Sequence, residues 1–284
     1  MQVHLVDGTY ELFRFHFAPG PSRVTAAGQD VAATQGVLRS MFQMIDDGVT
    51  HLAVATDHVI ESWRNDLYDG YKDGSGVPPE LFSQFPLLEE GLELAGFAVW
   101  PMVEYEADDA LAAGAVMAAA DPRVERVFIC TPDKDLAQCV TDDGRIVQYD
   151  RRKRQLIDRD GVIEKFGVAP ESIPDYLALV GDTADGFPGL KGWGAKSTAT
   201  VLSRYRHLED IPDAPGQWDV TVRGAAKLAA TLAEERDDAY LFRRIATVDV
   251  EGPEVGIVDD LEYRGTTPGF AEFCERIEAP GLIR

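Results

Sequence analysis

The sequence predicts an α/β fold: a mostly parallel sheet flanked by helices, followed by a smaller region of short helices. Over the first 130 residues, short apolar segments alternate with segments of helical periodicity, a pattern typical of parallel strands joined by crossover helices. The segment 145–157 then fits a β-hairpin whose turn carries four consecutive basic residues, Arg151 to Arg154. After about residue 160 the periodic segments are helical only.

Each element is predicted from local pattern. Strands are expected at 2–6, 51–56, 97–100 and 126–130, and helices at 31–47, 79–95 and 106–120. In the helix at 31–47, Val37, Met41 and Met44 share one face, and Pro79 suits the first turn of its helix. Further helices are expected at 159–166, 171–180, 195–204 and 223–240, with a loop at 211–219. The Gly- and Pro-rich segment 251–284 gives no clear pattern.

Composition excludes several protein classes. The 284 residues contain no apolar run long enough to predict a membrane span, and the first residues lack the basic and apolar regions of a secretory signal. Cys130, Cys139 and Cys274 form neither a disulfide framework nor a zinc-binding spacing. A reduced, cytoplasmic setting is therefore expected.

The net charge of −22 argues at first against a nucleic-acid partner, because DNA-binding domains usually carry a basic patch and a high pI. Two interpretations are open. The surface is acidic and binds no polyanion, or many carboxylates gather as metal ligands while a local basic strip grips the nucleic acid. Composition alone favours the first interpretation, so the positions of the acids have to decide.

Acidic residues follow every expected strand of the first region. They are Asp7, Asp57, the group Glu106, Asp108 and Asp109, and the pair Asp133 and Asp135, with a further pair, Asp182 and Asp185, in LVGDTADGFPG. A single Asp after a strand is usually a helix N-cap. Acids at successive strand ends, however, meet at the ligand-binding edge of a parallel sheet, where their repulsion requires compensation by hard divalent cations. This pattern favours a two-metal centre for phosphodiester hydrolysis.

A glycine- and lysine-rich turn precedes the helix expected at 195–204. The segment GLKGWGAKS contains Gly192 and Gly194, which permit a tight turn, and Lys196 and Ser197, which supply a cation and a donor at the start of the helix. Such a turn can hold a phosphate backbone without reading its sequence. A plain helix–turn–helix explains the same residues about equally well.

Together, four segments resemble the 5′-nuclease family, which includes the 5′→3′ exonuclease domain of bacterial DNA polymerase I, phage 5′ exonucleases and flap endonucleases. The segments are LVDGTYELFRFHF, YEADDALA, TPDKDLAQCV and LVGDTADGFPGLKGWGAKSTATVL, and weaker similarity extends to about residue 250. The resemblance implies a PIN-like (resolvase-like) catalytic domain at 1–165 with a short helical arch near 62–82. It implies a helical domain at 166–284, containing a SAM-like helix–three-turn–helix and a C-terminal extension.

The resemblance also implies roles for individual residues. Asp7, Asp57, Glu106 and Asp108, with Asp109 adjacent, look like the first set of metal ligands, and Asp133, Asp135, Asp182 and Asp185 look like the second. The ions would be two Mg²⁺ or Mn²⁺, with K⁺ often bound at the helix–three-turn–helix. Lys191, Gly192, Gly194, Lys196 and Ser197 would hold duplex DNA, and Arg14 is similar to a family arginine behind the first aspartate. Arg64 and Lys72 align with cations that polarise the scissile phosphate beside Asp7 and Asp108; the alternative is that they are exposed helix charges.

The expected function is that of a stand-alone 5′→3′ exonuclease or flap endonuclease of replication and repair, acting as a monomer on DNA with a 5′ end or 5′ flap, or on RNA–DNA primer junctions. The segment Asp73-Gly-Ser-Gly departs from the family by making the arch short and acidic, which puts threading of a flap in doubt. The turns containing Asp185-Gly-Phe-Pro-Gly and TPDKD also differ from the common forms but keep their acids. Two alternatives stay open: a non-catalytic protein that binds branched DNA, and a PIN-like ribonuclease.

Overall fold

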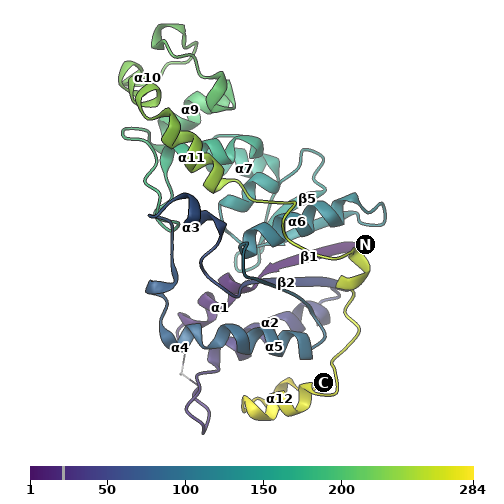
Figure 1. The fold of residues 1–284 in the computed structure, drawn as a ribbon. Coiled ribbons are helices and arrows are strands. Elements are labelled where there is room, and N and C mark those ends of the chain that lie inside the picture. The colour runs from purple at the N-terminus through teal and green to yellow at the C-terminus, as the bar shows by residue number, and fades with distance from the viewer. Residues whose placement is uncertain (21–22) are drawn as a thin grey trace. The chain divides into compact units, whose positions relative to one another are not determined.

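The computed structural model describes residues 1–20 and 23–284, which form two compact units (Figure 1). The first, called here the sheet unit, comprises 1–62, 73–131 and 249–284. The second, called here the helical unit, comprises 63–72 and 132–248. These units are defined by compactness and differ from the domain boundary expected near residue 165, which stays a prediction.

The sheet unit contains four parallel strands in the order β3-β2-β1-β4, as the alternating pattern predicts. Their bounds are β1 Gln2–Asp7, β2 His51–Asp57, β3 Ala98–Met102 and β4 Arg126–Cys130. Its helices are α1 Gly8–His16, α2 Ala32–Asp46, α4 Pro79–Phe82, α5 Gln84–Leu94, α6 Ala107–Ala120 and α12 Phe270–Arg276, with short 3-10 helices η1 Gly74–Gly76, η6 Val258–Leu261 and η7 Pro280–Leu282. Helix α6 covers one face of the strands, and α1, α2 and α5 lie on the other (Figure 1).

Burial on both faces explains the near-continuous apolar strands. Val3, Leu5 and Val54 are fully buried, as expected for a parallel sheet between two layers of helices. Helix α1 begins directly after β1, and its first residue, Gly8, lies against β2, where a Cβ would come within 2.7 Å of Val54 Cγ1. This close approach is not visible in the sequence, and α1 was not among the expected helices.

The helical unit contains the β-hairpin expected at 145–157 and a set of short helices. The hairpin pairs β5 Ile146–Asp150 with β6 Gln155–Ile157 in antiparallel fashion. The α-helices are α3 Trp63–Leu67, α7 Arg159–Phe166, α8 Ile173–Val180, α9 Ala195–Tyr205, α10 Ala225–Glu234 and α11 Arg236–Ala246. The 3-10 helices are η2 Asp135–Cys139, η3 Pro170–Ser172, η4 Leu208–Asp210 and η5 Pro215–Gln217. A separate core includes Phe187, whose ring stacks on that of Phe242 with centroids 5.6 Å apart.

Two expected helices are interrupted. The segment 79–95 divides into α4 and α5 at Ser83, and the segment 223–240 divides into α10 and α11 at Glu235. At Glu235 the backbone N–H donates to Thr231 O while the carbonyl accepts from Ala239 N, so one helix ends where the next begins. Periodicity continues across such a break, which is why the sequence predicts single helices. In the described residues, no helix combines the length and apolar character needed to cross a bilayer.

Candidate metal centre and phosphate-binding turn

Asp7 ends β1 and both of its carboxylate oxygens are engaged. Oδ1 accepts from Tyr10 N at 2.8 Å, which caps α1, and Oδ2 accepts from Thr131 Oγ1 at 3.0 Å. The residue is only 6% exposed. Asp7 is therefore a helix N-cap, and it is also a buried carboxylate held in a defined orientation at the carboxyl end of the sheet.

Asp57 and Glu106 lie at the same edge of the sheet unit. Asp57 Oδ1 accepts from Ala107 N at 2.7 Å, which ties the end of β2 to the start of α6. Glu106 is buried at the N-cap position of α6 and accepts from Ser62 Oγ at 2.7 Å. Asp108, half-buried, follows in the first turn of α6. The sheet unit thus brings carboxylates from several chain segments to the end of its strands, as the sequence predicts.

Asp109 differs from these residues because it is fully buried and both its oxygens accept backbone N–H groups. Oδ2 accepts from Glu106 N at 3.1 Å, and Oδ1 accepts from Asp249 N at 2.8 Å. These bonds fix the turn that carries Glu106 and Asp108. The geometry therefore favours a positioning role for Asp109, where the resemblance implies a member of the ligand set.

The helical unit contains a tight acidic cluster. Asp135, Asp182 and Asp185 each offer a carboxylate oxygen, and these oxygens lie within 4.8 Å of one another. All three residues are buried. Asp182 and Phe187 exchange two backbone hydrogen bonds, of 2.9 and 3.1 Å, which close the loop that carries Asp182 and Asp185. Asp133 is more exposed and accepts from Asp135 N at 3.0 Å.

Two lysines partly offset the charge of this cluster. Lys134 Nζ lies 2.6 Å from Asp182 Oδ2, and Lys72 Nζ lies 3.0 Å from Asp185 Oδ1. Asp135 Oδ1, in contrast, is buried without a hydrogen-bond partner in the described part of the chain. Burial, together with the charges of Asp133, Asp185 and Asp182, raises the pKa of Asp135 well above its ordinary value.

An orphaned carboxylate oxygen among three converging acids fits a hard divalent cation, which prefers oxygen ligands and would supply the missing charge. The described residues can therefore hold a divalent metal. Lys134 was not among the expected site residues. Its position between two acids in TPDKD was visible in the sequence, but its pairing with Asp182, nearly fifty residues away, was not.

Arg64 is 3% exposed, so the alternative that it is an exposed helix charge is wrong. Its Nε donates to Ile245 O at 2.8 Å and its Nη2 donates to Thr247 O at 3.2 Å. The guanidinium also stacks on Trp63, with 4.4 Å between Cζ and the ring centroid. These contacts hold the end of α11, and they favour a positioning role over direct contact with a phosphate.

The other expected cations have different surroundings. Lys72 is half-buried with its ammonium beside Asp185. Arg14 forms an ion pair with the buried Glu11 and lies over the Phe15 ring at 4.1 Å. Lys191 and Lys196 are exposed, and neither has an ion-pair partner among the residues that the structure describes. The exposed cations of the helical unit therefore include the two lysines of the glycine-rich turn.

The glycine-rich turn joins α8 to α9. Gly189 and Gly192 have φ of +67° and +91°, a conformation that strains residues with a side chain. Gly194 has φ of −118° and caps α9, with open space where a Cβ would lie. Ser197 Oγ donates to Gly194 O at 2.9 Å and accepts from Gly194 N at 3.1 Å. The hydroxyl expected to face a phosphate thus stabilises the start of the helix.

Trp193 anchors this turn in the core of the helical unit. Its side chain is 4% exposed, and its Nε1 donates to Leu228 O at 3.2 Å. Its ring lies 6.1 Å from that of Trp218, centroid to centroid. The buried tryptophan holds the turn so that Lys191 and Lys196, on either side of it, remain in solvent.

Two family models match the chain. Residues 2–167 match "5′-3′ exonuclease, N-terminal resolvase-like domain", and residues 168–268 match "5′-3′ exonuclease, C-terminal SAM fold". A 5′-3′ exonuclease of Aquifex aeolicus is 35% identical over 211 residues, covering 74% of this chain and 71% of that protein. DNA polymerase I of Borreliella burgdorferi is 33% identical over 286 residues; the match covers all of this chain but 30% of the polymerase.

Solved structures share the fold. T5 5′-exonuclease with bound zinc superposes with a TM-score of 0.67 at 18% identity, covering 98% of both chains. The catalytic core of Rad2 in complex with DNA substrate gives a TM-score of 0.61 at 15% identity, covering 99% of this chain and 92% of the other. The expected combination of a resolvase-like α/β domain with a helical SAM-like domain is confirmed.

Proposed function

Because this chain belongs to the 5′–3′ exonuclease family, we propose that it hydrolyses phosphodiester bonds at 5′ ends and 5′ flaps of DNA, or of RNA–DNA primer junctions. The observation that carries the proposal is the cluster of Asp135, Asp182 and Asp185, with ligand oxygens within 4.8 Å of one another. Three buried carboxylates this close repel one another, and Lys134 and Lys72 offset only part of their charge.

The proposal assigns the carboxylates to two Mg²⁺ or Mn²⁺ ions. Asp7, Asp57, Glu106 and Asp108 would hold one ion, and Asp133, Asp135, Asp182 and Asp185 would hold the other. When bound, such ions activate the attacking water and stabilise the leaving oxygen. Asp109 would fix the turn that presents Glu106 and Asp108, since its own oxygens are occupied by backbone donors.

The lysines beside the acids would act on the substrate. Lys72 Nζ lies 3.0 Å from Asp185 Oδ1. Its ammonium group would therefore stabilise negative charge on a phosphate bound beside this group of carboxylates. Lys134 would hold Asp182 in the orientation needed for a ligand. Arg64 would position the end of α11, so of the two cations expected to polarise the phosphate, only Lys72 would contact it.

Duplex DNA would be gripped at the start of α9. Lys191 and Lys196 supply cations, and Gly192 and Gly194 let a phosphate approach the backbone N–H groups of the first helical turn. Ser197 would stabilise the start of this helix through its hydrogen bond to Gly194 O. Arg14 would contact a phosphate only by giving up its ion pair with Glu11. We also propose that a K⁺ ion binds at this turn. Replacing K⁺ by Li⁺ in the buffer should therefore weaken duplex binding.

Cleavage of a labelled 5′-flap duplex tests this function. The wild type should release product with Mg²⁺ or Mn²⁺ and none with EDTA, whereas Asp182→Asn should bind the flap and leave it intact. Comparison of DNA and RNA flaps, and of blunt 5′ ends, would establish the substrate class. Wild-type protein that binds branched DNA but yields no product with either metal would identify a non-catalytic binding protein. Product from single-stranded RNA alone would indicate a PIN-like ribonuclease.

A further inference from the structure

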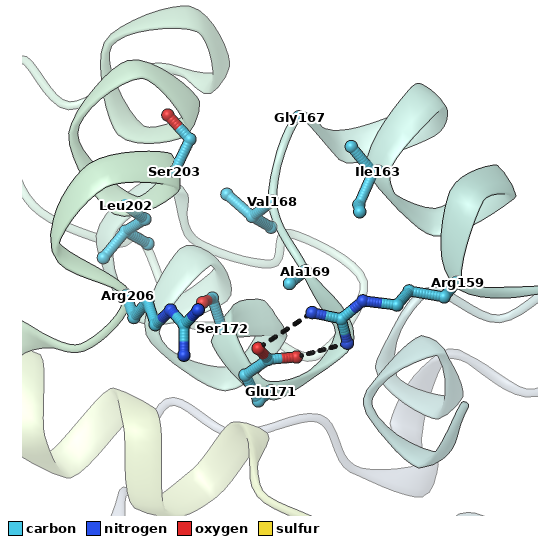
Figure 2. Close-up of a pocket in the computed structure, with 10 residues that line it drawn as sticks. All are labelled: Arg159, Ile163, Gly167, Val168, Ala169, Glu171, Ser172, Leu202, Ser203 and Arg206. Carbon is cyan, nitrogen blue, oxygen red and sulfur yellow. Dashed lines mark hydrogen bonds and ion pairs between the residues drawn. The ribbon is translucent and has the colours of Figure 1, made fainter. Parts of the chain in front are cut away.

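A pocket of about 230 Å³ in the helical unit contains none of the residues assigned above to metal or DNA (Figure 2). Its walls come from α7, from the segment 167–172 and from the last turn of α9. A volume of this size accommodates about one amino-acid residue.

One side of the pocket is apolar. Ile163 is 40% exposed, and it faces the buried side chains of Val168 and Leu202 across the pocket (Figure 2). Ala169 completes this aliphatic wall. The lining includes no aromatic ring, so nothing in it offers the stacking surface on which proteins usually hold a nucleobase.

The opposite side is polar, and one of its two arginines makes no direct ion pair with the described residues. Arg159 donates to both oxygens of Glu171, at 3.0 and 3.1 Å, and also pairs with Asp142. Arg206 is exposed, and its guanidinium has no hydrogen-bond or ion-pair partner among the described residues. The pKa of the Glu171 carboxyl is lowered, first by the hydrogen bond from Arg159 and also by the charge of Arg206, which places both cations near it.

The backbone of Arg206 is strained. Its φ and ψ are +66° and −57°, and His207 N donates to Tyr205 O at 2.8 Å, which defines a γ-turn with positive φ. This turn is rare for a residue with a side chain. The segment that follows is fixed in place by Asp175, which accepts hydrogen bonds from the His207 ring at 2.9 Å and from Leu208 N at 3.3 Å. Glycine would relieve the strain, so an arginine here suggests a use for its side chain.

Ser172 provides a second unused group. It occupies the N-cap position of α8 but makes no capping bond, and it is 1% exposed. Its Oγ has no hydrogen-bond partner in the part of the chain that the structure describes. A buried hydroxyl is normally paired, and this one lines the pocket near the positive end of the α8 dipole (Figure 2).

From one free guanidinium, one unpaired hydroxyl and an aliphatic wall, we propose that this pocket binds the carboxy-terminal carboxylate of another protein chain whose last residue is aliphatic. Arg206 and Ser172 would receive the carboxylate, and Ile163, Val168 and Leu202 would contact the last side chain. A phosphodiester backbone fits less well. The pocket offers a single cation without an ion-pair partner among the described residues, and its lining has no aromatic ring on which a base could stack.

Binding of a peptide at this pocket does not depend on nuclease activity, so it can be measured directly. The probe is acetyl-Ser-Gly-Ser-Leu with a free carboxylate, titrated into the ¹⁵N-labelled full chain while the amide resonances of Gly167, Val168 and Ala169 are followed. The matched probe is the same peptide with a carboxy-terminal amide. The free acid should shift these resonances saturably, and the amide should bind at least tenfold more weakly.

Two variants complete the test. Arg206→Gln and Ser172→Ala should each weaken binding of the free acid, the former by at least tenfold. Arg152→Gln, which changes an exposed arginine of the β5–β6 turn, should not. If one variant fails to fold, the other still tests the proposal, provided that its NMR spectrum is well dispersed. Equal binding of acid and amide, or shifts of these amides by duplex DNA or inorganic phosphate but not by peptide, would overturn the proposal.

Discussion

Replacing Asp135 by asparagine should make the metal-free protein more stable and remove most of its stabilisation by metal. Asp135 is 8% exposed, and its Oδ1 lacks a hydrogen-bond partner in the described residues. Its oxygens lie close to those of Asp182 and Asp185, which are paired with Lys134 and Lys72. Asparagine removes one negative charge from this cluster and adds an N–H₂ group that can donate to a neighbouring carboxylate.

The size of the effect follows from the orphaned oxygen. An unpaired buried acceptor costs about 1–3 kcal/mol, and more when it is charged. Asp135→Asn should therefore raise the free energy of unfolding of the metal-free protein by about 1–3 kcal/mol. For a chain of this length that corresponds to roughly 2–6 °C in Tm, at about 2 °C per kcal/mol.

The sign of the pH dependence is fixed by the direction of the pKa shift. The folded-state pKa of Asp135 is raised by burial and by its acidic neighbours, so the folded state disfavours the carboxylate. The destabilisation is absent below the unfolded-state pKa of about 3.9, grows as pH rises through the raised folded-state pKa, and is complete above it. The advantage of the variant should therefore be largest at neutral pH and vanish near pH 4.

Thermal unfolding followed by circular dichroism, in EDTA and in excess Mn²⁺, measures both effects. Metal at about 100 times its Kd should stabilise the wild type by about 2.7 kcal/mol, whereas the variant should gain much less. Asp210→Asn is the matched control, because Asp210 is exposed and remote in sequence from the cluster. A metal-free variant that is less stable than the wild type at pH 7, or equally stabilised by Mn²⁺, would refute the reasoning.

Three further outcomes are expected. Lys196→Ala should weaken duplex binding and lower the salt slope of log K by about 1, as measured by anisotropy; an unchanged slope would remove Lys196 from the interface. Lys72→Ala should lower kcat with little change in flap binding, because its ammonium lies beside Asp185; equal losses of both would make it a general phosphate contact. Trp193→Ala should cost about 3–5 kcal/mol of stability, and Trp193→Phe, which loses the bond to Leu228, distinctly less on urea unfolding.

The sequence was sufficient to predict the strands and the acids that follow them, because both depend on local pattern. An apolar strand buried on both faces is recognisable without its neighbours, and its carboxyl end fixes where Asp7 and Asp57 lie. The same applies to the glycine-rich turn, where Gly192 has positive φ.

Side-chain partners could not be predicted in this way, because they depend on segments distant in the chain. Arg64 and Asp109 both belong to motifs with a catalytic interpretation. Yet Arg64 is bonded to carbonyls about 180 residues away, and Asp109 accepts from Asp249 N. A motif fixes which residue types are present, whereas the packing decides whether a charged group faces a ligand or the backbone.

The effect of the strong acidity on DNA binding depends on where the cations lie. Many arginines are already committed to carboxylates: Arg123 to Asp121 and Asp259, Arg204 to Asp219, Arg243 to Asp175 and Glu209, and Arg284 to Asp46. Lys191 and Lys196 stay exposed and without an ion-pair partner in the described part of the chain. Under the proposed function, these two lysines supply attraction for DNA at the start of α9. The acidic remainder of the chain should suppress binding of DNA that cannot reach this turn.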